Sequence, residues 1–372
     1  MKKPSRAATR EARYDAAMAT ESKTSAPATP TRRGAQHERE LTAPVDLCDA
    51  RGNLNPASVG WSRQPLHHCN VSGHTPRKKR WNYWCLNTDK LLFSATIADV
   101  DHYVLAFVYL FDLETRRLVE RTAILPPGAI DLPSHVRADA VFEQGGRRVA
   151  FTEEKRGTRI AVTWPDFDGA PLAVDLLVER APAHETMNVV IPWSRERFQF
   201  TSKQNCLPVT GTIMLGTEKV QLARKDHAYA CLDFGRGVWK YRTAWNWGSA
   251  SAMLPDGRAL GLQLGAKWTD GTGMTENAIF LDGRISKLSE DIPFVYDEDD
   301  FMKPWRIKAK SKRVDLRFTP FHERVAKAKT GILSSEVHQL FGYYDGTVTP
   351  DSGECIAVEQ VFGWIEEHKA RW

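Results

Sequence analysis

The stretch WKYRTAWNWGSASAMLPDGRALGLQLGAKW, residues 239–268, decides the fold of this chain, because it predicts two long strands joined by a tight turn. Its centre, Pro-Asp-Gly at positions 255–257, supplies a preset φ, a turn-forming residue and a residue that tolerates positive φ. We expect Leu254 to pair with Arg258 across this turn. The stretch is therefore predicted to be a β-hairpin with a defined register.

The expected register gives the two faces of the hairpin different chemistry. Trp245 and Trp247 lie on one face, opposite Lys267 and Gly265. The other face is apolar and smooth, with Leu260, Leu262, Leu264, Ala250, Ala252 and Gly248. Indole rings beside a cation and a glycine are typical of a ligand pocket, since indole offers area and a cation-attracting face and glycine leaves room for approach. We predict that Trp245 and Trp247 bind a substrate.

Alternation of period two continues through the rest of the chain from about Leu41. Segments rich in β-branched and aromatic residues, such as 103–111 and 158–164, are separated by turn residues such as Gly145-Gly146. No helix of convincing length and capping interrupts them. This spacing predicts an all-β protein built as an antiparallel barrel or sandwich.

The formal charge of +5 belongs mostly to the N-terminal segment. Residues 1–40 hold nine Lys and Arg against five Asp and Glu, so 9 − 5 = +4 lies there and 5 − 4 = +1 in the rest. The segment has too little apolar surface for a core, so we expect a disordered basic tail over residues 1–42. Deleting residues 1–40 should leave the melting temperature nearly unchanged. The nearly neutral body argues against a nucleic-acid partner.

Targeting and cofactor signals are absent from the sequence as read. No apolar run follows Lys2 and Lys3 as in a secretory signal, and no run is long enough to span a membrane. Acidic residues in the first 21 positions weaken a mitochondrial reading without excluding it. Six cysteines without paired spacing indicate reduced thiols and a cytoplasmic protein. We expect no metal, since CxxC and HExxH are missing, and no organic cofactor.

Two further stretches place candidate residues. In RKKRWNYW, residues 77–84, Arg80 and Trp84 share one strand face and are candidates for substrate binding; the alternative for Arg80 is a buried structural pair. His67 and His68 point to opposite faces of a strand, and His67 is expected near a pocket mouth. In KWTDGTGMTEN, residues 267–277, three ionisable side chains follow the hairpin directly.

These three side chains are Lys267, Asp270 and Glu276, and we predict that they are catalytic. Their convergence on an aromatic-lined cavity is the usual arrangement of a ligand site, where burial raises a carboxyl pKa into general-acid range. The alternative is an ordinary turn between domains.

Long motifs carry a resemblance to a known family. They are GWSRQPLHHCN, RKKRWNYWC, MNVVIPWSRERFQFTSKQNCLPVTG, LDFGRGVW, KWTDGTGMTEN, DFMKPWRI and FGWIEEHKARW. Together they resemble domain-of-unknown-function family 2804, over essentially everything after the tail. A more distant similarity, to the carotenoid hydratase (hydroxyneurosporene synthase) group, rests on the order of shorter elements at 200–208, 209–211, 230–237, 245–247, 256–258 and 343–346.

The distant similarity implies two lipocalin-like β-domains, placed at residues 43–268 and 269–372, and a deep pocket for a largely apolar molecule. Asp233 fills the aspartate place of the hydratase pattern, but Phe234 stands where the pattern has histidine. Hydration of an alkene needs an acid to protonate carbon and a base to activate water. Asp233, as a catalytic candidate, supplies half of that apparatus.

Arg242 and Asn246 fall on the leucine face of the hairpin and are candidates for substrate binding. If this face is a packed core, Arg242 is buried and needs a carboxylate partner, for which Asp233 is the candidate. If it lines a cavity, Arg242 and Asp233 contact the ligand together.

The sequence favours a protein that binds a hydrophobic small molecule such as a lipid or terpenoid, and that is, or derives from, a cofactor-free hydratase, cyclase or isomerase. The alternatives are a non-catalytic lipid-binding protein and a structural module without a ligand. A cavity that holds Asp233 or Lys267 beside other ionisable groups favours catalysis, and an apolar cavity favours carriage. The absence of a cavity favours the structural module. The sequence predicts neither the substrate nor the oligomeric state.

Overall fold

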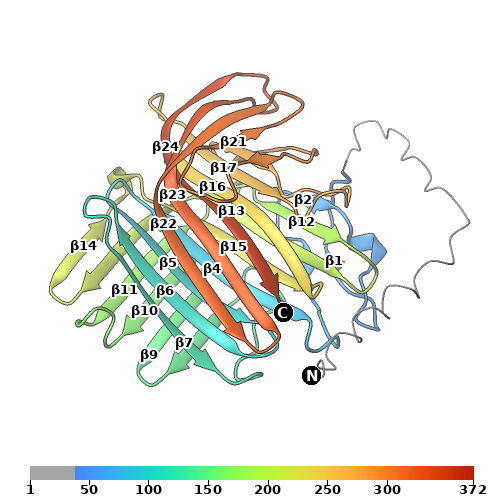
Figure 1. The fold of residues 1–372 in the computed structure, drawn as a ribbon, viewed down its shortest axis with the longest axis horizontal. Helices are drawn as coiled ribbons and strands as arrows, with labels where there is room; N and C mark the ends of the chain where they lie inside the picture. The colour runs from blue at the N-terminus through green and yellow to red at the C-terminus, as the bar shows by residue number, and fades with distance from the viewer. Residues whose placement is uncertain (1–37) are drawn as a thin grey trace, which may run out of the picture. The chain divides into compact units, whose positions relative to one another are not determined.

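The computed structural model describes residues 38–372, and strands make up most of this part of the chain (Figure 1). The helical segments within it are two short 3-10 turns, η1 (Pro56–Ser58) and η2 (Arg224–Asp226). The all-β prediction is confirmed. Residues 1–37 of the expected tail lie outside the described residues. Over residues 38–372 no helix has the length and apolar character to cross a membrane.

The first large sheet is antiparallel and barrel-like, with the strand order β7-β6-β5-β4-β15-β13-β11-β10-β9-β8. Its strands are β4 (Lys78–Asn87), β5 (Leu91–Asp99), β6 (Val104–Asp112), β7 (Leu118–Leu125), β8 (Ala140–Gln144), β9 (Arg147–Glu154), β10 (Gly157–Trp164), β11 (Leu172–Glu179), β13 (Phe198–Leu215) and β15 (Tyr229–Val238). Three strands branch from it, β2 (Trp61–Ser62), β12 (Met187–Pro192) and β14 (Glu218–Leu222). A separate parallel pair joins β1 (Val45–Asp46) to β3 (His67–His68).

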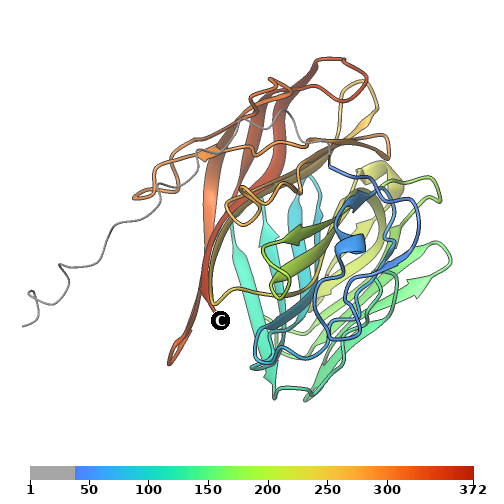
Figure 2. The ribbon, with the colours of Figure 1, turned by 90° about the vertical axis from the view of Figure 1, so that its right-hand side faces the viewer.

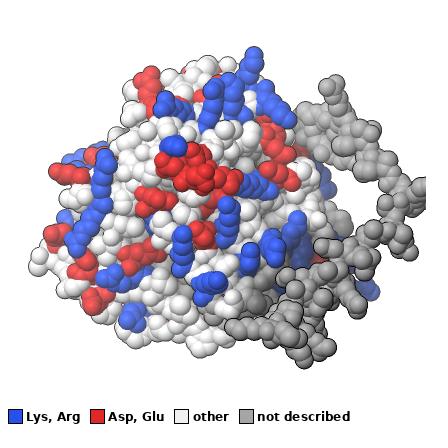
Figure 3. All heavy atoms as spheres, viewed as in Figure 1, with Lys and Arg blue, Asp and Glu red and all other residues white. Residues whose placement is uncertain are grey.

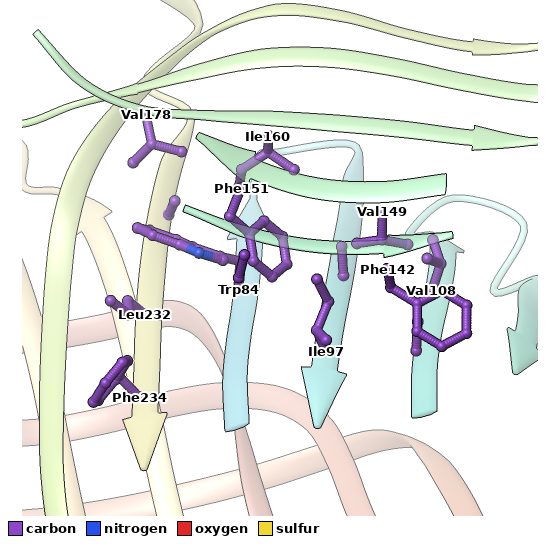
Figure 4. Packing of buried hydrophobic residues seen from close by; sticks show 14 of the residues in the cluster. Trp84, Ile97, Val108, Phe142, Val149, Phe151, Ile160, Val178, Leu232 and Phe234 are labelled. Atoms are coloured by element: carbon purple, nitrogen blue, oxygen red, sulfur yellow. The ribbon is translucent and has the colours of Figure 1, made fainter. Parts of the chain in front are cut away.

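The curvature of the first sheet depends on β13. Its first half pairs with β12 and β15 and its second half with β11 and β14, with a register shift between Gln204 and Leu207. A bulge of this kind bends a strand and increases its twist. Alternate apolar side chains therefore meet inside the sheet, where Trp84, Phe151 and Ile160 pack together (Figure 4).

The second sheet is antiparallel and follows the order β19-β18-β17-β16-β24-β23-β22-β21-β20. Its strands are β16 (Arg242–Met253), β17 (Ala259–Ala266), β18 (Ala278–Leu281), β19 (Arg284–Lys287), β20 (Phe294–Val295), β21 (Trp305–Lys308), β22 (Val314–Thr330), β23 (Leu333–Val348) and β24 (Ile356–Arg371). The predicted hairpin is β16–β17 and its register is confirmed, since Trp247 pairs with Gly265 and Leu254 N donates to Arg258 O at 2.8 Å. The ladder ends at Asn246 and Ala266, one step before Trp245 and Lys267.

The hairpin leucines lie in the core of the second sheet, with Trp305, Leu340 and Ile365, as the alternation predicts. The opposite face packs against the first sheet through an aromatic layer, in which Trp247 and Phe341 meet Tyr83 and Tyr109. Figure 2 shows the strands of the second sheet standing beside those of the first.

The chain passes from the first sheet to the second between Val238 and Arg242. The whole hairpin therefore belongs to the second sheet, and a division by sheets comes before residue 242 rather than at 268. The sequence does not mark this point, because period-two alternation continues unchanged across it.

Residues 38–41, which we placed in the tail, are held against the folded part. Trp61 N donates to Arg39 O at 2.9 Å and Leu41 N donates to Trp61 O at 2.7 Å. Glu38 is buried with a side-chain exposure of 1% and pairs with Lys287 of β19 at 2.8 Å. The folded part therefore begins before residue 43, the boundary that we expected.

Candidate functional site

A buried group of three charges lies between the two sheets. Lys203 Nζ is 2.7 Å from Asp233 Oδ2 and 3.3 Å from Glu276 Oε2. The side-chain exposures of the three residues are 6%, 14% and 1%, in that order. We call Lys203, Asp233 and Glu276 the inter-sheet charge cluster. Two members of the cluster, Asp233 and Glu276, were predicted from the sequence to be catalytic. Lys203, which links them, was not predicted.

The two sheets each contribute to this cluster. Lys203 on β13 and Asp233 on β15 are direct cross-strand partners in the first sheet. Glu276 comes from the segment between β17 and β18 in the second sheet. It reaches the cluster because position 265 is glycine: a Cβ there would lie 2.0 Å from Glu276 Oε1. The room that Gly265 leaves is thus occupied by a carboxylate of the chain itself.

Aromatic and polar neighbours fix the orientation of the three charges. The Lys203 ammonium lies 4.6 Å from the ring centroid of Trp247, a cation–π contact. Trp268 Nε1 donates to Glu276 Oε1 at 2.9 Å, and Thr201 Oγ1 donates to Asp233 Oδ1 at 3.2 Å. The charges are therefore held in a largely apolar setting with few hydrogen-bond donors.

The setting favours different protonation states at the cluster. Burial raises the pKa of the Glu276 carboxyl, and the charge on Lys203 only partly offsets this. Burial lowers the pKa of Lys203, but Asp233 and Glu276 outweigh it and raise that pKa overall. Glu276 Oε2 faces Lys203 Nζ at 3.3 Å and has no other polar partner among the described residues. Glu276 is thus the group best placed to hold an exchangeable proton.

A second buried ion pair adjoins the cluster. Glu38 accepts hydrogen bonds from Thr275 N at 2.9 Å and from Lys287 Nζ at 3.0 Å. Burial lowers the pKa of Lys287 to about 8, against the opposing charges of Glu38 and Glu276. Because Thr275 precedes Glu276 directly, residue 38 holds the segment that carries the candidate acid.

Lys267 belongs to a different group, on the leucine side of the second sheet. Its Nζ lies 2.7 Å from Glu367 Oε2 and donates to the Tyr296 hydroxyl at 2.6 Å. Asn246 Nδ2 also donates to Glu367 Oε2, at 2.7 Å. Lys267 and Asn246 therefore share Glu367 and Tyr296 as partners and contact neither Asp233 nor Glu276. The prediction that Lys267 lies on the tryptophan face is wrong, because regular pairing ends at Ala266 and Lys267 has a positive φ of 72°.

The half-buried Trp245 packs against other tryptophans at one end of the aromatic layer between the sheets. Its Nε1 donates to Glu366 Oε1 at 2.9 Å, and its ring centroid is 3.8 Å from that of His368. Trp239 and Trp372 pack beside it. Of the two hairpin tryptophans, only Trp247 contacts the inter-sheet charge cluster through the interactions described here.

Arg242 does not pair with Asp233, and this expectation is wrong. Its side chain is exposed near the start of β16, where it stands opposite Arg371 of β24. The partner of Asp233 is Lys203. The leucine face of β16 is covered only along its later residues, so the face that is core at Ala250 is solvent-exposed at Arg242.

The remaining candidates lie apart from the cluster. Arg80 pairs with Asp99 at 2.5 Å and Asp131 at 2.8 Å, which matches the structural alternative. Trp84 is in the packed core of the first sheet, and the buried His67 ring bonds through Nε2 to Ser58 O at 2.9 Å. Asp270 is exposed, and its Oδ1 accepts a hydrogen bond from Lys267 N at 2.9 Å.

The surface of residues 38–372 carries two hollows whose linings contain none of the candidate residues. One, of about 540 Å³, lies against residues of β21, β22 and β23. The other, of about 30 Å³, lies between His102, Ser335 and Trp372. Over residues 38–372, no group of three or more His, Cys, Asp or Glu side chains is arranged to hold a metal ion.

Sequence reasoning missed Lys203, the centre of the cluster. The structure shows why it matters, because Lys203 lies in a strand whose residues from Phe198 to Leu207 are buried on both faces, which the polar sequence FQFTSKQNCL does not indicate. A charge in such a strand needs a partner from a covering element. Glu367 and Tyr296, the partners of Lys267, were also missed, and they come from distant strands and loops.

The comparisons with known proteins identify a family and a set of similar folds. The model described as "Domain of unknown function (DUF2804)" matches residues 38–372. No curated protein matches the chain. Kievitone hydratase from Nectria haematococca is similar in structure at TM-score 0.44 and 7% identity, over 82% of this chain and 94% of that one. CghA with Sch210972 gives TM-score 0.42 and 10% identity, over 80% of this chain and 89% of that one.

Proposed function

The chain belongs to the DUF2804 family, whose description carries no activity, and we propose that it binds a largely apolar small molecule between the two sheets and performs acid–base chemistry on it. The observation that carries the proposal is the inter-sheet charge cluster. A buried carboxyl with a raised pKa lies 3.3 Å from an ammonium that also holds a second carboxylate. Pairs of titratable groups whose environments differ are the usual basis of acid and base assignments.

The proposed roles follow from these environments. Glu276 in its protonated form gives a proton to a carbon of a double bond, and Asp233 accepts a proton from the attacking water. The water oxygen bonds to the other carbon of the double bond, which completes the hydration. Lys203 then gives a proton to Glu276 and takes one from Asp233, which restores the starting protonation states. Without water, the same two carboxyls exchange a proton on a substrate carbon, which gives an isomerisation or a cyclisation.

Access to the cluster requires movement, because the side chains of Lys203 and Glu276 are only 6% and 1% exposed. The segment that carries Trp268 and Glu276 is the element that would have to move. Two glycines in it, Gly271 and Gly273, adopt positive φ of 71° and 81°. We expect opening of this segment to admit the substrate beside Trp247.

A second function is favoured by a specific observation, the nearly complete burial of Lys203 and Glu276. A buried charged triad can fix how two sheets pack without binding anything, which is the structural alternative. The two functions differ in what happens when one charge is removed while shape is kept.

The test uses Asp233→Asn and Glu276→Gln in the full chain, with Glu120→Gln as a matched control. Glu120, whose side chain is 26% exposed, pairs with the buried Arg324 at 2.7 Å at another place between the sheets. Native mass spectrometry of protein from its own host identifies a retained ligand. The proposal expects Asp233→Asn to melt near the parent temperature and to lose ligand or turnover, while Glu120→Gln keeps both. Retention of ligand by both site variants, or failure of both to fold, supports the structural alternative instead.

A further inference from the structure

Two arginines stand directly opposite each other on neighbouring strands of the second sheet. Arg242 of β16 pairs in register with Arg371 of β24, and both side chains are exposed. The same cross-strand row continues through Ser334 of β23 to Lys329 of β22. Like charges opposite each other on one face destabilise a sheet. Among the salt bridges formed within residues 38–372, none involves Arg242, Arg371 or Lys329.

An exposed apolar tip adjoins this basic row. Ile332, in the turn between β22 and β23, is 77% exposed. The Tyr241 hydroxyl donates to Ile332 O at 2.7 Å, which ties the tip to the start of β16 beside Arg242. Apolar and cationic side chains therefore occupy one end of the long hairpin.

We propose that this end of the second sheet docks on an anionic lipid bilayer surface. We call it the basic hairpin face, defined by Arg242, Lys329, Ile332 and Arg371. Cations near an anionic leaflet are attracted to it, and an exposed apolar side chain gains by entering the boundary with the acyl chains. A nucleic acid would satisfy the arginines and lysine but would leave Ile332 without a partner.

The neighbouring charges limit the surface that can make contact. Lys327 is paired with Glu336 at 2.7 Å, and Lys369 lies 3.9 Å from Glu298 of an acidic loop. In Figure 3, blue side chains lie over the lower halves of the long strands and red ones gather above them. The bilayer contact is therefore confined to the hairpin end, away from the acidic loop.

This proposal is independent of the chemistry proposed for the inter-sheet charge cluster. A protein that docks on a bilayer meets apolar small molecules where they are concentrated, but the docking itself needs only the basic hairpin face.

The test is sedimentation of the full chain with vesicles of phosphatidylcholine, with or without phosphatidylserine. We expect binding only when phosphatidylserine is present, and a decrease at high salt. Each cation near an anionic surface contributes about fivefold in affinity, so Arg242→Gln with Arg371→Gln should weaken binding about thirtyfold. Ile332→Ser should also weaken it, whereas Ile124→Ser, at a side chain 55% exposed on β7, should not.

Melting temperatures of all variants should stay close to that of the parent, since these side chains are exposed. Unchanged binding in the double arginine variant would overturn the proposal and assign vesicle binding to the basic residues before position 38. Equal binding to vesicles without phosphatidylserine, or binding of duplex DNA with none to vesicles, would also overturn it.

Discussion

Replacing Glu38 by Gln should destabilise the protein substantially, although Glu38 lies next to a segment that composition alone marks as dispensable. The carboxylate is 1% exposed and accepts hydrogen bonds from Thr275 N, Thr275 Oγ1 and Lys287 Nζ at 2.9, 3.0 and 3.0 Å. Removing one partner of a buried ion pair costs about 3–5 kcal/mol, because the other charge stays buried.

Deprotonation of Lys287 in the variant limits this loss of stability. Burial already lowers the pKa of Lys287 to about 8 with Glu38 in place, so in the variant the lysine loses its proton readily. We therefore expect the lower end of the range, about 3 kcal/mol. For a folded unit of this size that is a fall of roughly 3–6 °C in melting temperature.

The assay is thermal unfolding of three proteins beside the parent. Glu40→Gln is the matched control, because Glu40 pairs with Arg63 at 3.0 Å while 38% exposed, and an exposed pair contributes about 1 kcal/mol or less. Deletion of residues 2–37 should have little effect. If Glu38→Gln melted within a degree of Glu40→Gln, the buried pair would not stabilise the fold, and the original expectation that residues 1–40 can be deleted would stand.

Three further outcomes are expected. Gly265→Ala should displace Glu276, because its Cβ would lie 2.0 Å from Oε1, and should cost about 1–3 kcal/mol in urea unfolding; an unchanged midpoint would contradict this. Burial lowers the pKa of His67 to about 4, so the folded state binds fewer protons than the unfolded state between pH 6.5 and 4 and loses stability as pH falls through that window, by up to about 3 kcal/mol; His67→Gln should flatten this part of the profile. A thiol reagent should modify only Cys355 in the native protein and all six cysteines after denaturation, since the other five are buried; a second fast-reacting thiol would refute that.

The hairpin could be predicted because its information is local. Pro255 to Gly257 fixes the turn, and alternation then fixes which face each later residue occupies. Lys203 could not be placed in the same way, since its neighbours Asp233 and Glu276 are set by pairing between strands and sheets far apart in sequence. The structure brings Asp233 and Glu276 together, while Lys267 went to another face.

Arg242 shows a second limit of reasoning from alternation. Alternation assigns a side to each residue, but it does not say how far along a strand that side stays covered. Ala250 and Arg242 are on the same side of β16, but only Ala250 is buried in the core of the second sheet. Coverage is a property of the neighbouring strands and loops, and therefore of the tertiary structure.

The place of β16 between β17 and β24 has a consequence for synthesis. One edge of β16 is paired as soon as the hairpin forms, but the other has to wait for residues 356–371. Until then a long strand with two outward indole rings keeps a free edge, the type of intermediate that associates with other chains. Slowing elongation between Ala266 and Ile356 should therefore lower the soluble yield of this protein, while slowing it within the first sheet should not.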